Sequence, residues 1–251
     1  MLQGPILLVI LAAAIVFIVW STAKLKLNPF LSLLITAYGV GLAARMPIDK
    51  IATNIAEGFG SLMTGIGLVI VAGTIIGVFL EKSGAAVVMA DTILKWVGEK
   101  RPALAMSIIG YIVSIPVFCD SGFVILSSLN KALSRKSGVS LTALGIALST
   151  GLYATHVMVP PTPGPLAAAG NLGVTNLGMV IMIDLAVALP SMIAGYLWAK
   201  RWSGHFDPGQ KLDGDDAGLS WEKLKAQYGK LPSPVAAFAP LVVPILLIAL
   251  K

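Results

Sequence analysis

Long apolar segments, each close to the length of a membrane-spanning helix, recur along this chain. Gly4–Trp20, Pro29–Ala44, Gly60–Leu80 and Leu177–Trp198 are of this kind, and about 20 apolar residues cross the hydrocarbon core of a bilayer. Because that core offers no water to backbone N–H and C=O groups, such segments are expected to form helices. Only 12% of the residues are charged, against about 25% in soluble domains. The sequence therefore predicts an all-α polytopic membrane protein.

Two short breaks interrupt the apolar sequence between Ile115 and Ala169. The first, Pro116–Gly122, reads PVFCDSG, and the second, His156–Pro165, ends in PPTPGP. Irregular backbone at membrane depth is tolerated only where protein or a water-filled cavity satisfies its polar groups. We therefore expect the two breaks to lie together near the bilayer midplane and to form a solute site.

Residues 1–101 are predicted to supply scaffold spans and surface helices. Within them, Arg45–Gly58 is amphipathic and is expected to lie in the membrane interface. A surface helix is expected over Ala85–Val97, in the polar connector after the third span.

Residues 102–176 are predicted to form a transport region. Pro102–Phe118 and Gly122–Leu133 read as the two arms of a re-entrant hairpin, because the second arm is too short to cross comfortably. The second break then divides a helix. The rest of the chain is expected to comprise a span at 177–198, a hydrophilic loop at 199–234 and the beginning of a further span at 235–251.

The placement of basic residues predicts the topology. If the hairpin enters and leaves on one side, fifteen Lys and Arg residues face that side, and only Arg45 and Lys50 face the other. Basic loops stay in the cytoplasm, so the net charge of +6 reports topology and not nucleic-acid binding. The N-terminus is therefore expected outside, with loops 81–101, 131–140 and 199–234 in the cytoplasm. Two full crossings would give the same parity, so arm length alone argues for the re-entrant hairpin.

Three ionisable residues within the apolar segments are candidates for proton coupling: Asp120, His156 and Asp184. Such groups are costly at membrane depth unless they are paired or solvated. Asp120 could instead cap a helix that begins at Gly122. His156 could exchange a proton near neutral pH, or donate a hydrogen bond to a carbonyl freed by the break. Asp184, which faces no break in this interpretation, could be a second protonation site or a polar tether to a neighbouring helix.

Neutral groups at the breaks could hold an anionic solute. Because no Lys or Arg lies within the apolar segments, a carboxylate would have to bind to hydroxyls and to free N–H groups where half-helices begin. The substrate-binding candidates are Ser121, Gly122, Thr162, Gly164 and Asn171. Cys119, the single cysteine, is expected to be a packing residue.

Other functional classes find less support in the sequence. Asp120 and His156 could in principle bind a metal, but no third ligand lies within reach, so we expect no metal, no cofactor and no enzyme. No GxxxxGK[ST] motif occurs, which argues against an ATP-driven pump. A passive channel would share the breaks but would not need titratable groups beside them. The sequence thus favours a secondary transporter over a channel or facilitator.

The breaks also resemble the gluconate permease family of proton symporters. The similarity rests on PVFCDSGFV at Pro116–Val124, on ATH at Ala154–His156 and on PPTPGP at Pro160–Pro165. It implies an inverted-repeat transporter that carries gluconate or a related small sugar acid with protons across a bacterial inner membrane. A sodium-coupled carboxylate transporter is the alternative.

Departures from the family pattern bear on these expectations. Asp120 stands where many relatives have Glu, so its carboxylate reaches one carbon less far. Thr162 stands where many relatives have His, so this chain lacks one possible proton-carrying group. Family members are roughly twice as long, and this chain ends within an apolar segment, so it looks like one repeat and the start of the next. We expect that a lone repeat does not transport. Family analogy and the GxxxG spacing of Gly73 and Gly77 suggest a homodimer.

Overall fold

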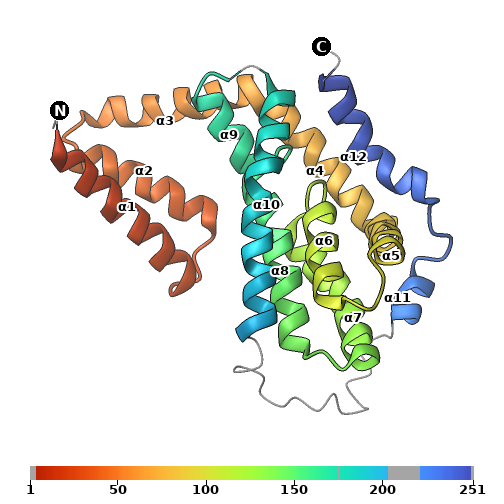
Figure 1. The fold of residues 1–251 in the computed structure, drawn as a ribbon. Coiled ribbons are helices and arrows are strands. Elements are labelled where there is room, and N and C mark those ends of the chain that lie inside the picture. The colour runs from red at the N-terminus through yellow and green to blue at the C-terminus, as the bar shows by residue number, and fades with distance from the viewer. Residues whose placement is uncertain (1–3, 175, 203–220, 250–251) are drawn as a thin grey trace. The chain divides into compact units, whose positions relative to one another are not determined.

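The computed structural model describes residues 4–174, 176–202 and 221–249, and within these ranges every regular element is a helix (Figure 1). Four helical segments are long and apolar enough to cross a membrane, which confirms the predicted all-helical, multi-pass membrane protein. The elements are α1 (Pro5–Ala23), α2 (Pro29–Ala43), α3 (Ile48–Leu62), the π-helix η1 (Met63–Gly67), α4 (Leu68–Lys82), α5 (Ala85–Val97), α6 (Pro102–Val113), α7 (Cys119–Ser137), α8 (Leu141–Met158), α9 (Pro163–Asn171), α10 (Leu177–Trp202), α11 (Trp221–Gln227) and α12 (Pro234–Ala249).

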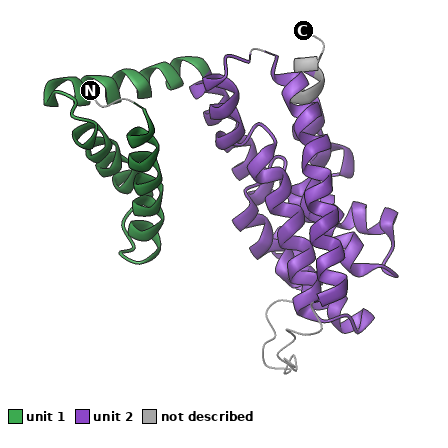
Figure 2. Cartoon of the chain, turned by 60° about the vertical axis from the view of Figure 1, so that its left-hand side comes forward, with its two compact units in different colours: residues 1–65 green, residues 66–251 purple. Residues whose placement is uncertain are grey.

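The chain divides into two compact units, Met1–Gly65 and Ile66–Lys251 (Figure 2). In the first unit, α1 and α2 pack side by side. The hydroxyls of Ser21 and Ser32, both fully buried, form a hydrogen bond between these two helices. Many large apolar side chains of α1 and α2 are exposed, as expected for helices that face lipid.

Helical structure continues without interruption from Ile48 to Lys82. The predicted interfacial helix and the predicted third span are therefore not separated by a turn; the π-helix η1 lies between α3 and α4 instead. Of the apolar residues of α3, Ile51 is buried, whereas Ile48 is 73% exposed. Gly58 and Gly60 suggested a boundary, but a glycine inside a helix costs only about 1 kcal/mol and does not have to end it.

The second unit is organised around α8, which packs against α6, α7 and α10 (Figure 1). Leu148 and Leu152 of α8 are fully buried. Gly110 of α6 and Gly151 of α8 lie where the two backbones approach: a Cβ added to Gly110 would be 2.6 Å from the carbonyl oxygen of Leu148. Small residues at this crossing let the helices pack closely, as in many membrane proteins.

The helix α5 has the predicted bounds, but the prediction that it is a surface helix is wrong. Its residues from Ala85 to Ala90, together with Ile93 and Leu94, are buried. The helices α6, α7 and α12 pack against it. The charged residues that flank α5 suggested exposure, and only the tertiary packing of distant segments buries it.

The predicted hairpin corresponds to α6 and α7, with the arm lengths reversed. The first arm has 12 residues and the second has 19, or about 18 Å and 28 Å of helix. Glu99, before α6, forms an ion pair with Lys136, near the end of α7. The outer ends of the two arms therefore lie on the same side. Whether this hairpin is re-entrant in the bilayer stays a prediction.

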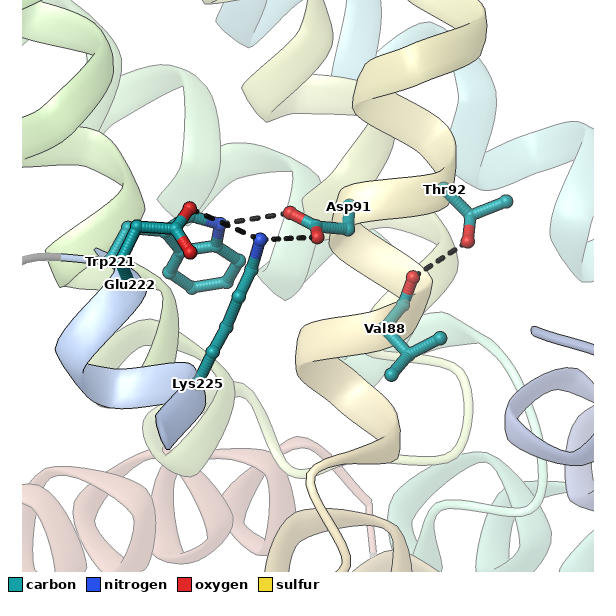
Figure 3. A network of polar contacts seen from close by, with 6 residues as sticks. All are labelled: Val88, Asp91, Thr92, Trp221, Glu222 and Lys225. Atoms are coloured by element: carbon teal, nitrogen blue, oxygen red, sulfur yellow. Dashed lines mark hydrogen bonds and ion pairs between the residues drawn. The ribbon is translucent and has the colours of Figure 1, made fainter. Parts of the chain in front are cut away.

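The hydrophilic segment after α10 contains a short helix, α11, that the sequence analysis did not predict. Trp221 is 7% exposed, and its Nε1 donates a hydrogen bond to Asp91 Oδ1 of α5 at 2.8 Å (Figure 3). Lys225 Nζ lies 2.5 Å from Asp91 Oδ2 and 3.4 Å from Glu222 Oε1. These contacts attach α11 to α5.

Candidate functional site

The two breaks lie against each other, as the sequence analysis predicted. The first comprises the residues between α6 and α7, and the second those between α8 and α9. Pro116 and Phe118 of the first break and Pro161 and Thr162 of the second line one small cavity of about 10 Å³. The rings of Phe118 and His156 meet edge to face, with centroids 5.7 Å apart. Residues far apart in sequence thus form one locus.

The helix α4 supplies the surface on which both breaks rest. A Cβ added to Gly73 would lie 3.2 Å from both Cβ and O of Pro161, and one added to Gly77 would lie 2.7 Å from the carbonyl oxygen of Pro116. Because Gly73 and Gly77 have no Cβ, the irregular backbone of the two breaks can approach α4 closely. Because both glycines make close contacts within the chain, their spacing no longer argues for a homodimer.

Asp120 lies in the first turn of α7 and does not cap that helix. Phe118 is the N-cap residue, so the alternative that Asp120 caps a helix starting at Gly122 is wrong. The Asp120 carboxylate is exposed. Its Oδ1 accepts a hydrogen bond from Tyr153 Oη at 3.3 Å and a long one from Cys119 Sγ at 3.8 Å. A carboxylate in the first turn also interacts favourably with the helix dipole.

His156 occupies the last turn of α8, within reach of the charge of Asp120. Its Nδ1 is buried and has no hydrogen-bond partner among the described residues. The alternative in which the imidazole donates to a freed backbone carbonyl is therefore not observed in this part of the chain. Buried ring nitrogens normally have a partner, so Nδ1 is an exception among the described residues.

The neutral candidates differ in what they offer. Ser121 is half-buried next to Asp120, and Gly122 is buried against Leu152. Thr162 is buried at the N-cap position of α9, but its hydroxyl donates to the carbonyl oxygen of Val159 at 2.8 Å. Gly164 is exposed, with open space around it.

The starts of α7 and α9 are unequal as anion sites. In α7, Gly122 N–H bonds back to Phe118 O at 2.8 Å, which leaves the three preceding N–H groups free. In α9, the first and third residues are Pro163 and Pro165, which carry no N–H. Before Leu166, whose N–H bonds to Thr162 O, only Gly164 can donate. The start of α7 therefore offers more free N–H groups than the start of α9.

Asp184 faces the second break, contrary to the interpretation from sequence. It lines a cavity of about 510 Å³ together with Met158 and Gly164. The carboxylate makes no hydrogen bond to a described residue, so the polar tether is not observed there either. Asn171 is exposed at the end of α9 and does not line this cavity, so the structure does not bring it to the site.

Tyr153 is the residue that the sequence analysis missed. It lies on α8, three positions before His156, and residues at this spacing share a helix face. An aromatic residue preceding a histidine by three could have been noted, but tyrosine is common in apolar helices and nothing local linked it to Asp120. Among the described residues no group of three His, Cys, Asp or Glu side chains could hold a metal.

Comparison with known proteins gives a consistent result. A family model described as GntP family permease matches residues 6–251. The chain is 37% identical to an uncharacterized permease of Haemophilus influenzae, over 98% of this chain and 51% of the relative. It is 35% identical to the gluconate permease of Pseudomonas aeruginosa (91% and 50%) and 38% identical to that of Bacillus subtilis (77% and 43%). The chain thus spans about half the length of these relatives. No solved structure matches it.

Proposed function

The chain belongs to the GntP family of permeases, and we propose that it carries out proton-coupled uptake of gluconate or a related small hydroxy carboxylate. The members of this family are transporters and not enzymes. The proposal rests on one observation above all: the two breaks meet, with Asp120, Tyr153 and His156 beside them. Two relatives named gluconate permeases support the substrate class.

In this proposal the solute carboxylate binds at the start of α7. The free N–H groups of Cys119, Asp120 and Ser121 point into the break and carry the positive end of the helix dipole. The Ser121 hydroxyl adds a further donor. Backbone donors of this kind bind an anion without a basic side chain, and none lies within the apolar segments.

Coupling to protons follows from the position of Asp120 in the same turn. While Asp120 is ionised, its charge occupies the positive end of the helix and repels a second carboxylate. Protonation removes that charge, so the solute and the proton favour each other's binding, and this linkage is reciprocal. Tyr153 holds the Asp120 carboxylate in place, and His156 offers Nδ1 as a second proton site or as a donor to the solute.

The proposed cycle places the hairpin α6–α7 as a re-entrant element whose open end faces the cytoplasm, with the N-terminus outside. Lys136 and the other basic residues at that end agree with the positive-inside rule. Rigid-body movement of the transport region against the scaffold then exposes the site alternately on the two sides of the membrane.

Transport assays test this function directly. Because we expect that a lone repeat does not transport, the assay uses this chain as part of a permease of full family length. Proteoliposomes that contain this permease should accumulate labelled gluconate when the outside is acidic, and an inward sodium gradient of equal size should not replace the pH gradient. Accumulation driven by sodium would replace proton coupling with sodium coupling. Gluconate entry that only equilibrates under either gradient would indicate a passive facilitator, and no entry at all would reject gluconate as the substrate.

A further inference from the structure

Another pocket lies at the opposite end of the bundle from the breaks, where α6 and α8 begin and α10 ends. It has a volume of about 650 Å³ and is lined from three parts of the chain: residues 100–104, residues 139–143 and residues 196–200. We call it the basic pocket, because Lys100, Arg101 and Lys200 line it and no described Asp or Glu does. None of the transport steps proposed above uses it.

The described residues contribute no ion pair to the three cations of the basic pocket. All three cations are exposed. A neighbouring cavity differs, because acidic residues line it together with basic ones: its charged residues are Lys95, Lys136, Lys225, Asp91, Glu99 and Glu222. There Lys136 pairs with Glu99, and Lys225 pairs with Asp91 and Glu222. Three cations that pair with no described residue, gathered in one concave site, concentrate positive potential and attract an anion.

The floor of the basic pocket is apolar. Pro102, Ala103, Leu104, Val139 and Ala143 contribute to its lining. Among the described side chains that line it, the polar ones besides the cations are Tyr196 and Ser140. The Ser140 hydroxyl accepts a hydrogen bond from Ala143 N–H. A ligand that fits this lining has a compact anionic group and an adjoining apolar part.

The surface beside the pocket is the surface that faces lipid. Ile193 and Leu197 of α10 are exposed, and Trp198 and Trp202 are 45% and 47% exposed one turn further along. Tryptophans of this kind gather at the level of lipid headgroups. The pocket therefore lies where a headgroup can enter it while its acyl chains stay along α10.

We propose that the basic pocket binds the phosphodiester headgroup of an anionic phospholipid from the cytoplasmic leaflet. Basic pockets between membrane helices on the cytoplasmic side are suited to such headgroups. The N-terminal ends of α6 and α8 carry partial positive charge, which also favours an anion in this pocket. Because α8 runs from this pocket to His156, a bound lipid fixes the helix that carries the transport site. The inference requires the cytoplasmic orientation proposed above but not a particular substrate.

A lipid titration tests the proposal. Purified protein in detergent is heated with increasing dioleoyl-phosphatidylglycerol, with dioleoyl-phosphatidylcholine, or with inorganic phosphate, and the apparent Tm is followed. Phosphatidylglycerol should raise the apparent Tm saturably, and the other two should not. Lys200→Gln should raise the half-saturating concentration of phosphatidylglycerol about fivefold. Combining it with Arg101→Gln should raise that concentration about twenty-fivefold or more, because each basic contact contributes a similar amount of binding free energy.

Arg201→Gln is the matched control. Arg201 follows Lys200 on the same helix, but its guanidinium lies 5.4 Å from the centroid of the Trp202 ring and it does not line the pocket. This variant should bind phosphatidylglycerol as the wild type does. Equal loss in Lys200→Gln and Arg201→Gln, or equal stabilisation by both lipids, would overturn the proposal. Stabilisation by inorganic phosphate alone would show a soluble anion site and would also overturn the assignment to lipid. Transport of gluconate plays no part in this readout, so failure here and failure of the proposed function remain distinguishable.

Discussion

Replacing Gly77 by alanine should destabilise the protein and slow transport, because Gly77 is where α4 meets the first break. The added Cβ would lie 2.7 Å from the Pro116 carbonyl oxygen. Ordinary contacts between carbon and oxygen exceed this by about 0.5 Å or more, so either α4 or the break must move. The clashing atom belongs to the backbone, so a change of side-chain rotamer cannot relieve the contact.

The magnitude follows from two opposing effects. Overpacking a tight contact costs about 1–3 kcal/mol, whereas exchanging glycine for alanine inside a helix gains about 1 kcal/mol. The net destabilisation of Gly77→Ala should thus be about 0–2 kcal/mol. Gly145 of α8 is a matched control, because a Cβ there meets nothing within 4 Å. Gly145→Ala should therefore be neutral or stabilising by up to about 1 kcal/mol.

The two variants can be compared by thermal unfolding in detergent and by gluconate uptake in proteoliposomes. For a chain of this length, each kcal/mol of destabilisation lowers the apparent Tm by roughly 2–4 °C. The apparent Tm of Gly77→Ala should therefore fall several degrees below that of Gly145→Ala. Its uptake should fall as well, because the first break moves. If Gly77→Ala matched Gly145→Ala in both stability and uptake, α4 would not be the support of the breaks.

Three further predictions concern the polar contacts. Tyr153→Phe should lower gluconate uptake several-fold with little loss of stability, since it removes only the hydroxyl that bonds to Asp120. Tyr38→Phe on α2 serves as its control. Equal uptake in the two variants would show that the bond between Tyr153 and Asp120 does not contribute to transport. Trp221→Phe should lower the stability of the protein by about 1 kcal/mol, because the bond from Nε1 to Asp91 is lost, and an unchanged melting curve would contradict the attachment of α11. For Lys225, burial lowers the pKa, but the hydrogen bond and charge of Asp91 outweigh it and raise the pKa above 10.5. The stabilisation from Lys225 should be fully present below that pH and lost as the pH rises through the raised pKa. The difference in apparent Tm between wild type and Lys225→Met should therefore shrink above pH 10.5, and a difference that grows would refute the ion pair.

Features governed by local chemistry were predictable from the sequence. The predicted segments Pro29–Ala44 and Pro102–Phe118 begin at the same residues as α2 and α6. The missing N–H and fixed φ of proline suit the first position of a helix. The two breaks were predictable for the same reason, since several prolines and glycines close together cannot continue a helix. Their convergence followed from the requirement that irregular backbone in a membrane be covered by protein.

Features that depend on distant contacts were not predictable. Nothing in the local sequence distinguishes Tyr153 from other aromatic residues of apolar helices, because its contact with Asp120 depends on the packing of α7 against α8. Asp184 seemed remote from the breaks because the packing of α10 on α8 could not be read from its own segment. The start of α7 was placed too late because Gly122 was read as the beginning of the second arm, whereas Cys119 and Asp120 are already helical.

The most direct test of the central claim compares wild type and Asp120→Asn in proteoliposomes, in two assays of labelled gluconate. One assay measures accumulation driven by an imposed pH gradient, and the other measures exchange between equal gluconate concentrations on both sides. If Asp120 carries the coupled proton, the variant should lose accumulation and retain exchange, because its permanently neutral side chain still leaves the start of α7 open to the solute. Undiminished accumulation in Asp120→Asn would contradict the account and would move proton coupling to His156.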